Sequence, residues 1–249
     1  MLPLPCGIKV LVIGLGMGGV TWRAIQPNKT QVLTMLNEEA NSPFEITIRH
    51  GIAEPDEEGQ QHEGKTARAC HDLYLNFIER YQPDVLCVGS RGGKFAEWLL
   101  KERKWRRGLA FFGSVKLREC CQHAAAYQRF VVVHGSRDGS QQLDSIAQAV
   151  MQERGGEHRH TLIEMTGCNH SLYNQDAIER YGVQAMGSES ASDDEKGAAS
   201  AKVEALSAEE KGNINPWYGE DGKRLMSRIL YQAHRSYVDS LTELMARHA

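Results

Sequence analysis

The chain has 249 residues, of which 41% are hydrophobic and 24% are charged, and its formal net charge is −3. A chain of this length can bury one sizeable core, so we expect a single domain over residues 1–249. The charge balance lacks the surplus of Lys and Arg with which proteins bind polyanions, which argues against nucleic acid as a partner.

An apolar stretch at residues 10–20 is interrupted by glycines and is too short to span a bilayer, and no small-residue cleavage site follows it. The six cysteines show no CxxC spacing, which argues against a zinc site and against a redox pair. We therefore expect a cytoplasmic protein with reduced thiols, no metal and no membrane association.

Six short runs rich in β-branched residues predict strands, and helix-length amphipathic segments lie between most of them. This alternation predicts an α/β fold, a three-layer sandwich in which a mostly parallel sheet of about six strands has helices on both faces. The predicted strands are residues 9–13, 44–48, 85–88, 109–112, 130–133 and 161–165, and the clearest helical segments are 67–81, 95–105 and 143–153.

Two segments near the end differ in character. Residues 187–212 consist of Ser, Ala, Glu, Asp, Lys and Gly with almost nothing to bury, a composition that predicts a flexible surface insertion. Apolar residues from 225 onward recur close to helical spacing, so we expect a C-terminal helix at about 222–247 that docks on the sheet.

The third predicted strand runs into Gly89-Ser90-Arg91-Gly92-Gly93 and out into an amphipathic helix. A serine on such a turn has its hydroxyl above the sheet, and the N-terminus of the helix faces any developing negative charge. Glycines suit the turn because side chains would collide there. The pattern departs from GxSxG at Val88, and a purely structural turn is the competing interpretation.

An aspartate and a histidine follow later predicted strands. Asp138 follows the fifth strand, and His170 lies just past the sixth. An aspartate in this place can orient a histidine and stabilise the imidazolium that forms when a serine is deprotonated. A turn or N-cap role is the alternative for Asp138, and Asp144 is a weaker candidate because it lies within a predicted helix. The order Ser90, Asp138, His170, after the third, fifth and sixth predicted strands, favours a catalytic triad.

The segments VGSRGG, VVVHGSRD and MTGCNHSL, spread over roughly residues 9–172, resemble the α/β-hydrolase superfamily, particularly its small members related to esterases, thioesterases and dienelactone hydrolases. The resemblance implies a serine hydrolase with an acyl-enzyme on Ser90, a small-molecule acyl substrate and no cofactor. It also implies an oxyanion hole made by the backbone N–H of Arg91 with that of Leu15 or Gly16. The Arg91 side chain either favours an acidic substrate or packs under a neighbouring loop.

Two nucleotide-binding patterns compete with this interpretation. Gly14, Gly16 and Gly19 match the dinucleotide fingerprint, but the acidic residue expected about 20 residues on is missing. The second predicted strand instead leads to Arg49, which suits a 2′-phosphate, so an NAD(P)-binding protein stays an alternative. Residues 59–66 match the Walker A pattern in full, but the acidic segment 54–58 before them would repel phosphates, and we interpret them as a polar loop.

A catalytically inactive binding module of the same fold is a further alternative. The missing glycine at Val88 favours it, and the intact serine, aspartate and histidine argue against it. The sequence indicates neither the substrate nor the oligomeric state.

Overall fold

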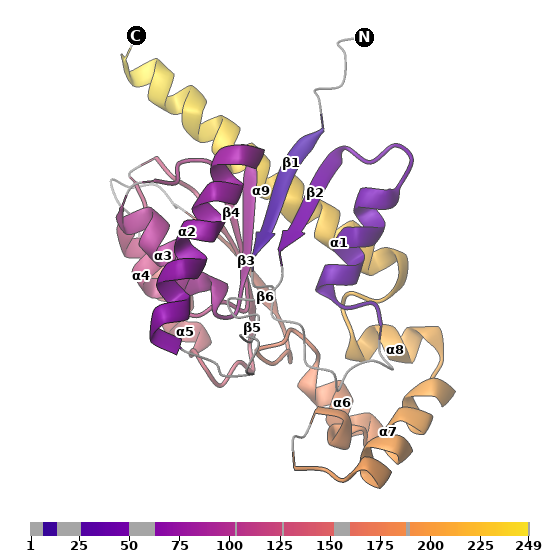
Figure 1. Ribbon diagram of the computed structural model, residues 1–249. Coiled ribbons are helices and arrows are strands. Elements are labelled where there is room, and N and C mark those ends of the chain that lie inside the picture. The colour runs from indigo at the N-terminus through magenta and orange to yellow at the C-terminus, as the bar shows by residue number, and fades with distance from the viewer. Residues whose placement is uncertain are drawn as a thin grey trace.

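A computed structural model gives the structure of the chain, and it describes residues 7–13, 26–49, 63–102, 104–125, 127–151, 160–187 and 190–248. Strands alternate with helices along most of this length (Figure 1). The strands are β1 (Ile8–Ile13), β2 (Phe44–Arg49), β3 (Val85–Gly89), β4 (Gly108–Phe112), β5 (Val131–Gly135) and β6 (Thr161–Met165). The helices are α1 (Lys29–Glu38), α2 (Glu63–Tyr81), α3 (Gly92–Lys101), α4 (Leu117–His123), α5 (Leu143–Met151), α6 (Gln175–Tyr181), the 3₁₀ helix η2 (Gln184–Gly187), α7 (Asp193–Ala205), α8 (Ala208–Ile214) and α9 (Gly219–His248).

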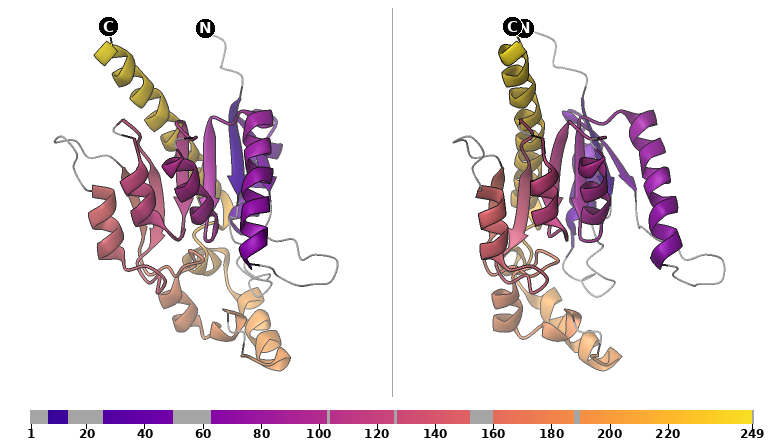
Figure 2. Two further views of the ribbon diagram at one scale, coloured as in Figure 1. Left: turned by 60° about the vertical axis from the view of Figure 1, so that its left-hand side comes forward. Right: turned by 90° about the vertical axis from the view of Figure 1, so that its left-hand side faces the viewer.

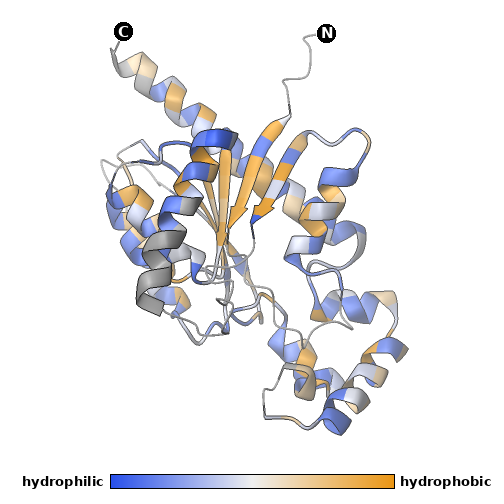
Figure 3. Ribbon diagram, in the orientation of Figure 1, coloured by the Kyte–Doolittle hydropathy of each residue, from blue (hydrophilic) through white to orange (hydrophobic). Residues whose placement is uncertain are grey.

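The six strands form one sheet in the order β2-β1-β3-β4-β5-β6, and all neighbouring strands are parallel. Every residue of β3, β4 and β5 is buried, which is why these strands are continuous hydrophobic runs rather than alternating ones. Figure 3 shows the strands as the most uniformly hydrophobic part of the molecule. The predicted α/β class and the predicted strand positions are confirmed.

Helices cover both faces of the sheet, as the α/β prediction requires (Figures 1 and 2). Side chains of one strand alternate between the faces, so Val10 and Val12 pack under α1 and α9, whereas Leu11 and Ile13 pack under the layer formed by α2, α3, α4 and α5. Each fully buried Val, Leu or Ile contributes about 1.5–3 kcal/mol by leaving water. The sheet is thus held between two apolar layers.

A small helical unit follows β6 and comprises α6, η2, α7 and α8. It has its own buried apolar cluster, to which Ile178, Val203 and Ile214 belong, and it lies beyond the carboxyl end of the sheet (Figure 1). The expected flexible insertion at 187–212 is therefore corrected, because most of that segment is helical. Its helices α7 and α8 begin at capping boxes headed by Ser192 and Ser207. These side chains accept hydrogen bonds from first-turn N–H groups, which have no partner within the helix.

The chain then forms α9, where the sequence predicted a helix at about 222–247. Its first half packs on the sheet through Met226, Ile229, Leu230 and Ala233, and its C-terminal part extends past the sheet (Figure 2). None of the helices in the described residues is both long enough and apolar enough to cross a membrane.

Candidate active site

Three polar side chains meet at the carboxyl edge of the sheet. Ser90 follows β3, Asp138 lies in the loop after β5, and His170 lies in the loop after β6. Carboxyl ends of parallel strands share one edge, and the crevice where the strand order reverses is the usual ligand site of such sheets. Here the reversal lies between β1 and β3, so Ser90 stands beside that crevice.

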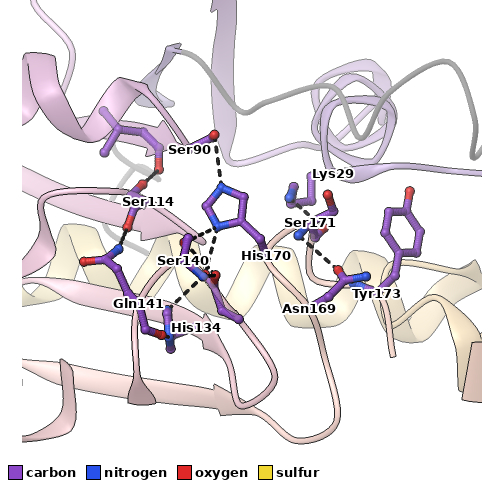
Figure 4. Close-up of polar contacts among 12 residues, drawn as sticks. Lys29, Ser90, Ser114, His134, Ser140, Gln141, Asn169, His170, Ser171 and Tyr173 are labelled. Carbon is purple, nitrogen blue, oxygen red and sulfur yellow. Dashed lines mark hydrogen bonds and ion pairs between the residues drawn. The ribbon is translucent and has the colours of Figure 1, made fainter. Parts of the chain in front are cut away.

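The three side chains form a continuous hydrogen-bonded path. His170 Nε2 lies 3.1 Å from Ser90 Oγ, and His170 Nδ1 lies 2.8 Å from Asp138 Oδ2 (Figure 4 draws the serine and the histidine). Since a carboxylate only accepts, Nδ1 carries the proton and Nε2 offers its lone pair to the Ser90 hydroxyl. This is the tautomer a general base needs to take the proton of a nucleophilic serine.

A strained turn presents Ser90 at this place. The residue has a φ of 45°, a left-handed conformation that costs side-chain-bearing residues roughly 1–2 kcal/mol. The turn needs two glycines after it: a Cβ at Gly92 would lie 2.9 Å from the Ile13 carbonyl oxygen, and one at Gly93 would lie 1.9 Å from that of Val115. The close packing of α3 on the sheet edge therefore depends on Gly92 and Gly93.

Val88, the departure from GxSxG, fits this turn. Its side chain is fully buried beneath the helical layer, and its Cβ lies 3.4 Å from where a Cβ at Gly92 would stand. This separation is an ordinary van der Waals contact, so Val88 does not conflict with the turn. A serine on a strand-to-helix turn, followed along the chain by the acid and then by the histidine, is the arrangement of the α/β hydrolases.

The chain has an α/β-hydrolase-like fold.

No family model matches the chain, and no curated protein matches it. Among solved structures, it is similar to an alpha-beta serine hydrolase homologue from Coxiella burnetii, with 14% identity, a TM-score of 0.45, and coverage of 66% of this chain and 77% of that one. It is also similar to an esterase domain from Rhodothermus marinus, with 13% identity, a TM-score of 0.42, and coverage of 73% of this chain and 87% of that one. A third similar structure is Est1E from Butyrivibrio proteoclasticus, with 14% identity, a TM-score of 0.41, and coverage of 75% of this chain and 87% of that one.

At this candidate site the aspartate is buried and the histidine is partly exposed. The Asp138 side chain is fully buried, whereas that of His170 is 33% exposed. Burial by itself raises the pKa of Asp138, but hydrogen bonds from His170 and Ser140 outweigh it and hold that pKa below its ordinary value. The carboxylate is therefore ionised at neutral pH.

Ser140 is a partner of the acid that the sequence did not reveal. Its hydroxyl donates to Asp138 Oδ1 at 2.6 Å, and its backbone N–H donates to the same oxygen at 2.8 Å. The hydroxyl oxygen also lies 3.0 Å from His170 Nδ1, so it shares the proton that points at Asp138 (Figure 4). The Asp-x-Ser spacing is an Asx turn, a signal too common to single out from sequence.

The loop that carries His170 lies directly on the ends of two strands. A Cβ at Gly113 would come within 2.3 Å of the His170 carbonyl oxygen, and one at Gly135 within 2.2 Å of that of Cys168. Asn169 braces the loop from within, because its side-chain oxygen accepts the N–H groups of residues 171 and 173 at 3.0 and 3.2 Å (Figure 4). These contacts fix the histidine relative to β4 and β5.

A buried lysine lies beside the same loop. Lys29, the first residue of α1, donates from Nζ to the Ser171 carbonyl oxygen at 2.9 Å (Figure 4). Burial lowers its pKa to about 8, although the nearby Cys168 thiol acts in the opposite direction. The amine thus supports the backbone next to His170, a role that no sequence pattern indicated.

A chain of buried polar groups runs behind the acid. Ser114 Oγ donates to the Val88 carbonyl oxygen at 2.9 Å, and the Gln141 side chain donates to the Ser114 carbonyl oxygen. The Gln141 carbonyl oxygen in turn lies 3.1 Å from His134 Nε2 (Figure 4). This chain links the strand that carries Ser90 to the loop that carries Asp138, and the sequence analysis missed all its side chains.

Some sequence predictions lie outside the described residues. Leu15 and Gly16, the candidate oxyanion donors, and Gly14 and Gly19 of the dinucleotide pattern are among them, as are residues 59–62 of the Walker A match. The rest of that match, residues 63–66, forms the start of α2 rather than a polar loop. Arg91 is described: it directly precedes α3, and the residue is exposed. Among the residues that the structure describes, no cluster of His, Cys, Asp and Glu could hold a metal ion.

A surface hollow of about 860 Å³ lies elsewhere on the molecule. Residues of α1 and α9 line it, including Leu36, Lys223 and Tyr231. It is therefore separate from the candidate active site at the strand ends.

Proposed function

We propose that this chain is a serine hydrolase that cleaves an ester- or thioester-type bond of a small acyl substrate through an acyl-enzyme on Ser90. The observation that carries the proposal is the unbroken hydrogen-bonded path from Ser90 through His170 to the buried Asp138. An inactive module would have no need of a strained serine aligned with a histidine in the reactive tautomer.

The proposed reaction has two halves. Ser90 Oγ attacks the acyl carbonyl while its proton passes to His170 Nε2, and the Asp138 carboxylate stabilises the imidazolium. The imidazolium then gives that proton to the leaving group, and water releases the acyl group by the same route in reverse. The oxyanion is held by the Arg91 N–H at the N-terminus of α3, together with that of Leu15 or Gly16.

Labelling with a reporter-tagged fluorophosphonate tests the proposal, because this probe phosphonylates an activated serine whatever the natural substrate is. We expect the wild-type chain to be labelled and Ser90→Ala and His170→Ala to lose labelling, since each removes an indispensable part of the nucleophile. Ser145→Ala and His123→Ala are matched controls away from the site and keep the wild-type rate. Folded wild-type protein that is not labelled would overturn the proposal.

A further inference from the structure

Two histidines face one oxygen of the acid. His134, the residue before the last of β5, is fully buried, and its Nδ1 lies 3.7 Å from Asp138 Oδ2, the oxygen that also accepts from His170. His134 Nε2 lies 3.1 Å from a backbone carbonyl oxygen, that of Gln141, and must donate to it. His134 Nδ1 is then left without a hydrogen-bond partner in the described structure.

The orientation of His134 is fixed from the strand that carries Ser90. Gln141, which accepts from His134 Nε2, donates through its side chain to Ser114, and Ser114 donates to the carbonyl oxygen of Val88, two residues before the serine. Ser114 is fully buried, so water cannot readily replace its hydrogen bonds, and breaking them would cost free energy. A ring held in this way keeps Nδ1 directed at Asp138.

The protonation state of His134 follows from its surroundings. Burial lowers its pKa, Asp138 and the Gln141 carbonyl act against that lowering, and the neighbouring His170 adds to it. Two further carboxylates lie on elements packed against β5, Glu164 at the position of β6 paired with His134 and Asp144 in the first turn of α5, and both are exposed. His134 is therefore neutral at neutral pH and gains its proton only in acid.

We propose that His134 is a positioning residue that acts on His170 through Asp138. While it is neutral, Asp138 Oδ2 serves His170 alone. A proton taken from solvent onto Nδ1 creates a second N–H donor, and the ensuing hydrogen bond to Asp138 Oδ2 draws this oxygen away from His170. Protonation of His134 therefore adds a loss of activity in acid. This inference rests on the proposed function, because it needs a Ser90 that His170 activates.

The rate of fluorophosphonate labelling across about pH 4.5–8.5 tests it on the full chain. His134→Gln keeps an amide donor for the Gln141 carbonyl but cannot titrate, and His160→Gln is a matched control. His160 is a buried histidine before β6, at the opposite end of the sheet, where its Nδ1 accepts from the Phe130 N–H at 3.1 Å.

Near pH 8 we expect all three proteins to label within about threefold of one another, because His134 is neutral there. On the acid side the logarithm of the rate should fall more steeply in wild type and in His160→Gln than in His134→Gln, by about one further unit per pH unit. At about pH 5 the variant should exceed wild type by about tenfold or more, a fraction of the loss that a misoriented triad histidine causes.

Parallel acid limbs in wild type and His134→Gln would overturn the inference, and so would a loss by one constant factor at every pH, which indicates a structural role alone. Wild type that is not labelled at any pH contradicts the proposed function instead. If His134→Gln does not fold, ¹⁵N NMR of wild-type histidines decides. Protonation of His134 Nδ1 over the pH range of the steeper slope supports the inference, and an Nδ1 that stays unprotonated until labelling has vanished overturns it.

Discussion

Asp138 lies at the centre of the candidate site, and several hydrogen-bond donors stabilise its carboxylate. Two hydrogen bonds from Ser140 reach one carboxylate oxygen, and His170 donates to the other. A charge buried in this way is tolerated only because its hydrogen bonds replace those of water. The acid therefore depends on Ser140 as much as on the histidine.

Replacing Ser140 by Ala should slow fluorophosphonate labelling by about tenfold to a hundredfold, because a hydrogen bond to a charged group contributes about 1.5–3 kcal/mol. The loss should also raise the pKa of Asp138, since the Ser140 hydroxyl is one of the groups that lower it. Ser140→Thr, which keeps the hydroxyl, should restore most of the rate, and Ser145→Ala should leave it unchanged. A wild-type rate in Ser140→Ala would show that the backbone N–H alone suffices.

Lys29 makes a separate prediction about stability. Its folded pKa of about 8 lies below the unfolded value of 10.5, so unfolding takes up a proton between these values and stability rises with pH through that window. Below it the cost of burying the charge is full, about 3 kcal/mol for a shift of this size. The free energy of unfolding of Lys29→Met should therefore exceed that of wild type near pH 7. The upper limit of the difference is the cost of burying the charge, reduced by about 1 kcal/mol for the lost hydrogen bond.

Urea unfolding at several pH values measures this difference. The difference in free energy of unfolding between Lys29→Met and wild type should narrow as the pH rises above about 8, because the wild-type amine is then neutral in the folded chain. Lys101→Met, which changes an exposed lysine of α3, should show no such trend. A gap that is constant with pH would mean that Lys29 is not buried as a charge.

At the residue scale, the sequence could single out only the residues that match a known order of catalytic side chains along the chain, here serine, aspartate and histidine. Ser90, Asp138 and His170 each follow a predictable strand, and the structure brings them together. Ser140, His134 and Lys29 escaped because their partners are a side chain or a backbone carbonyl supplied by a neighbouring loop or helix. Such contacts depend on loop conformation, which residue spacing does not encode.

At the scale of elements, the turn between β3 and α3 decides whether Ser90 is presented at all. Gly92 and Gly93 allow the start of α3 to lie close to the carbonyl oxygens of Ile13 and Val115. A sequence pattern that scores each position alone treats Val88 as a defect. In the structure Val88 is fully buried, and a side chain at Gly92 or Gly93 would first meet the carbonyl oxygen of Ile13 or Val115 rather than Val88.

Gly93→Ala should therefore be disruptive although alanine favours helices. The new Cβ would stand 1.9 Å from the Val115 carbonyl oxygen, which is backbone and cannot rotate away. We expect a loss of about 1–3 kcal/mol in the free energy of unfolding, typical of overpacking, together with slower labelling of Ser90.

Gly197→Ala is the matched control for this change. Gly197 lies inside α7 with no atom within 4 Å of the position of its Cβ, so alanine should stabilise the chain by about 0.5–1 kcal/mol. Chemical denaturation and labelling measure both variants. Equal stability of Gly93→Ala and wild type would contradict the close approach of α3.

The helices α7 and α8 show where composition misleads. Only two residues of α7, Ala199 and Val203, are buried, so the segment has the low apolar content of a flexible one. The sequence feature that indicates helix here is the capping box at the first turn. Ser192 and Glu195 stand three residues apart, as the capping box requires, and Ser207 and Glu210 repeat the spacing. Helix starts can thus be predicted from sequence even where burial cannot.

For the whole molecule, alternation of strands and helices sufficed to predict three layers, because a parallel sheet needs a crossover helix after each strand and cover on both faces. The order of the strands was not predictable in the same way. It depends on which face each crossover takes, and it is this order that places Ser90 beside the crevice at β1 and β3. The helical unit beyond β6 was equally hidden, since its docking depends on a cluster spread over four short elements.

The strand order also divides the folding problem into two unequal parts. From β3 to β6 every strand pairs with the next strand along the chain, so the half of the sheet that carries Ser90, Asp138 and His170 forms through short loop closures. β1 is different, because it must insert between β2 and β3, and its pairing of Val12 with Cys87 closes a long loop. We expect the triad half to assemble early, and the wall of the crevice beside Ser90 to be completed by a late, slow step.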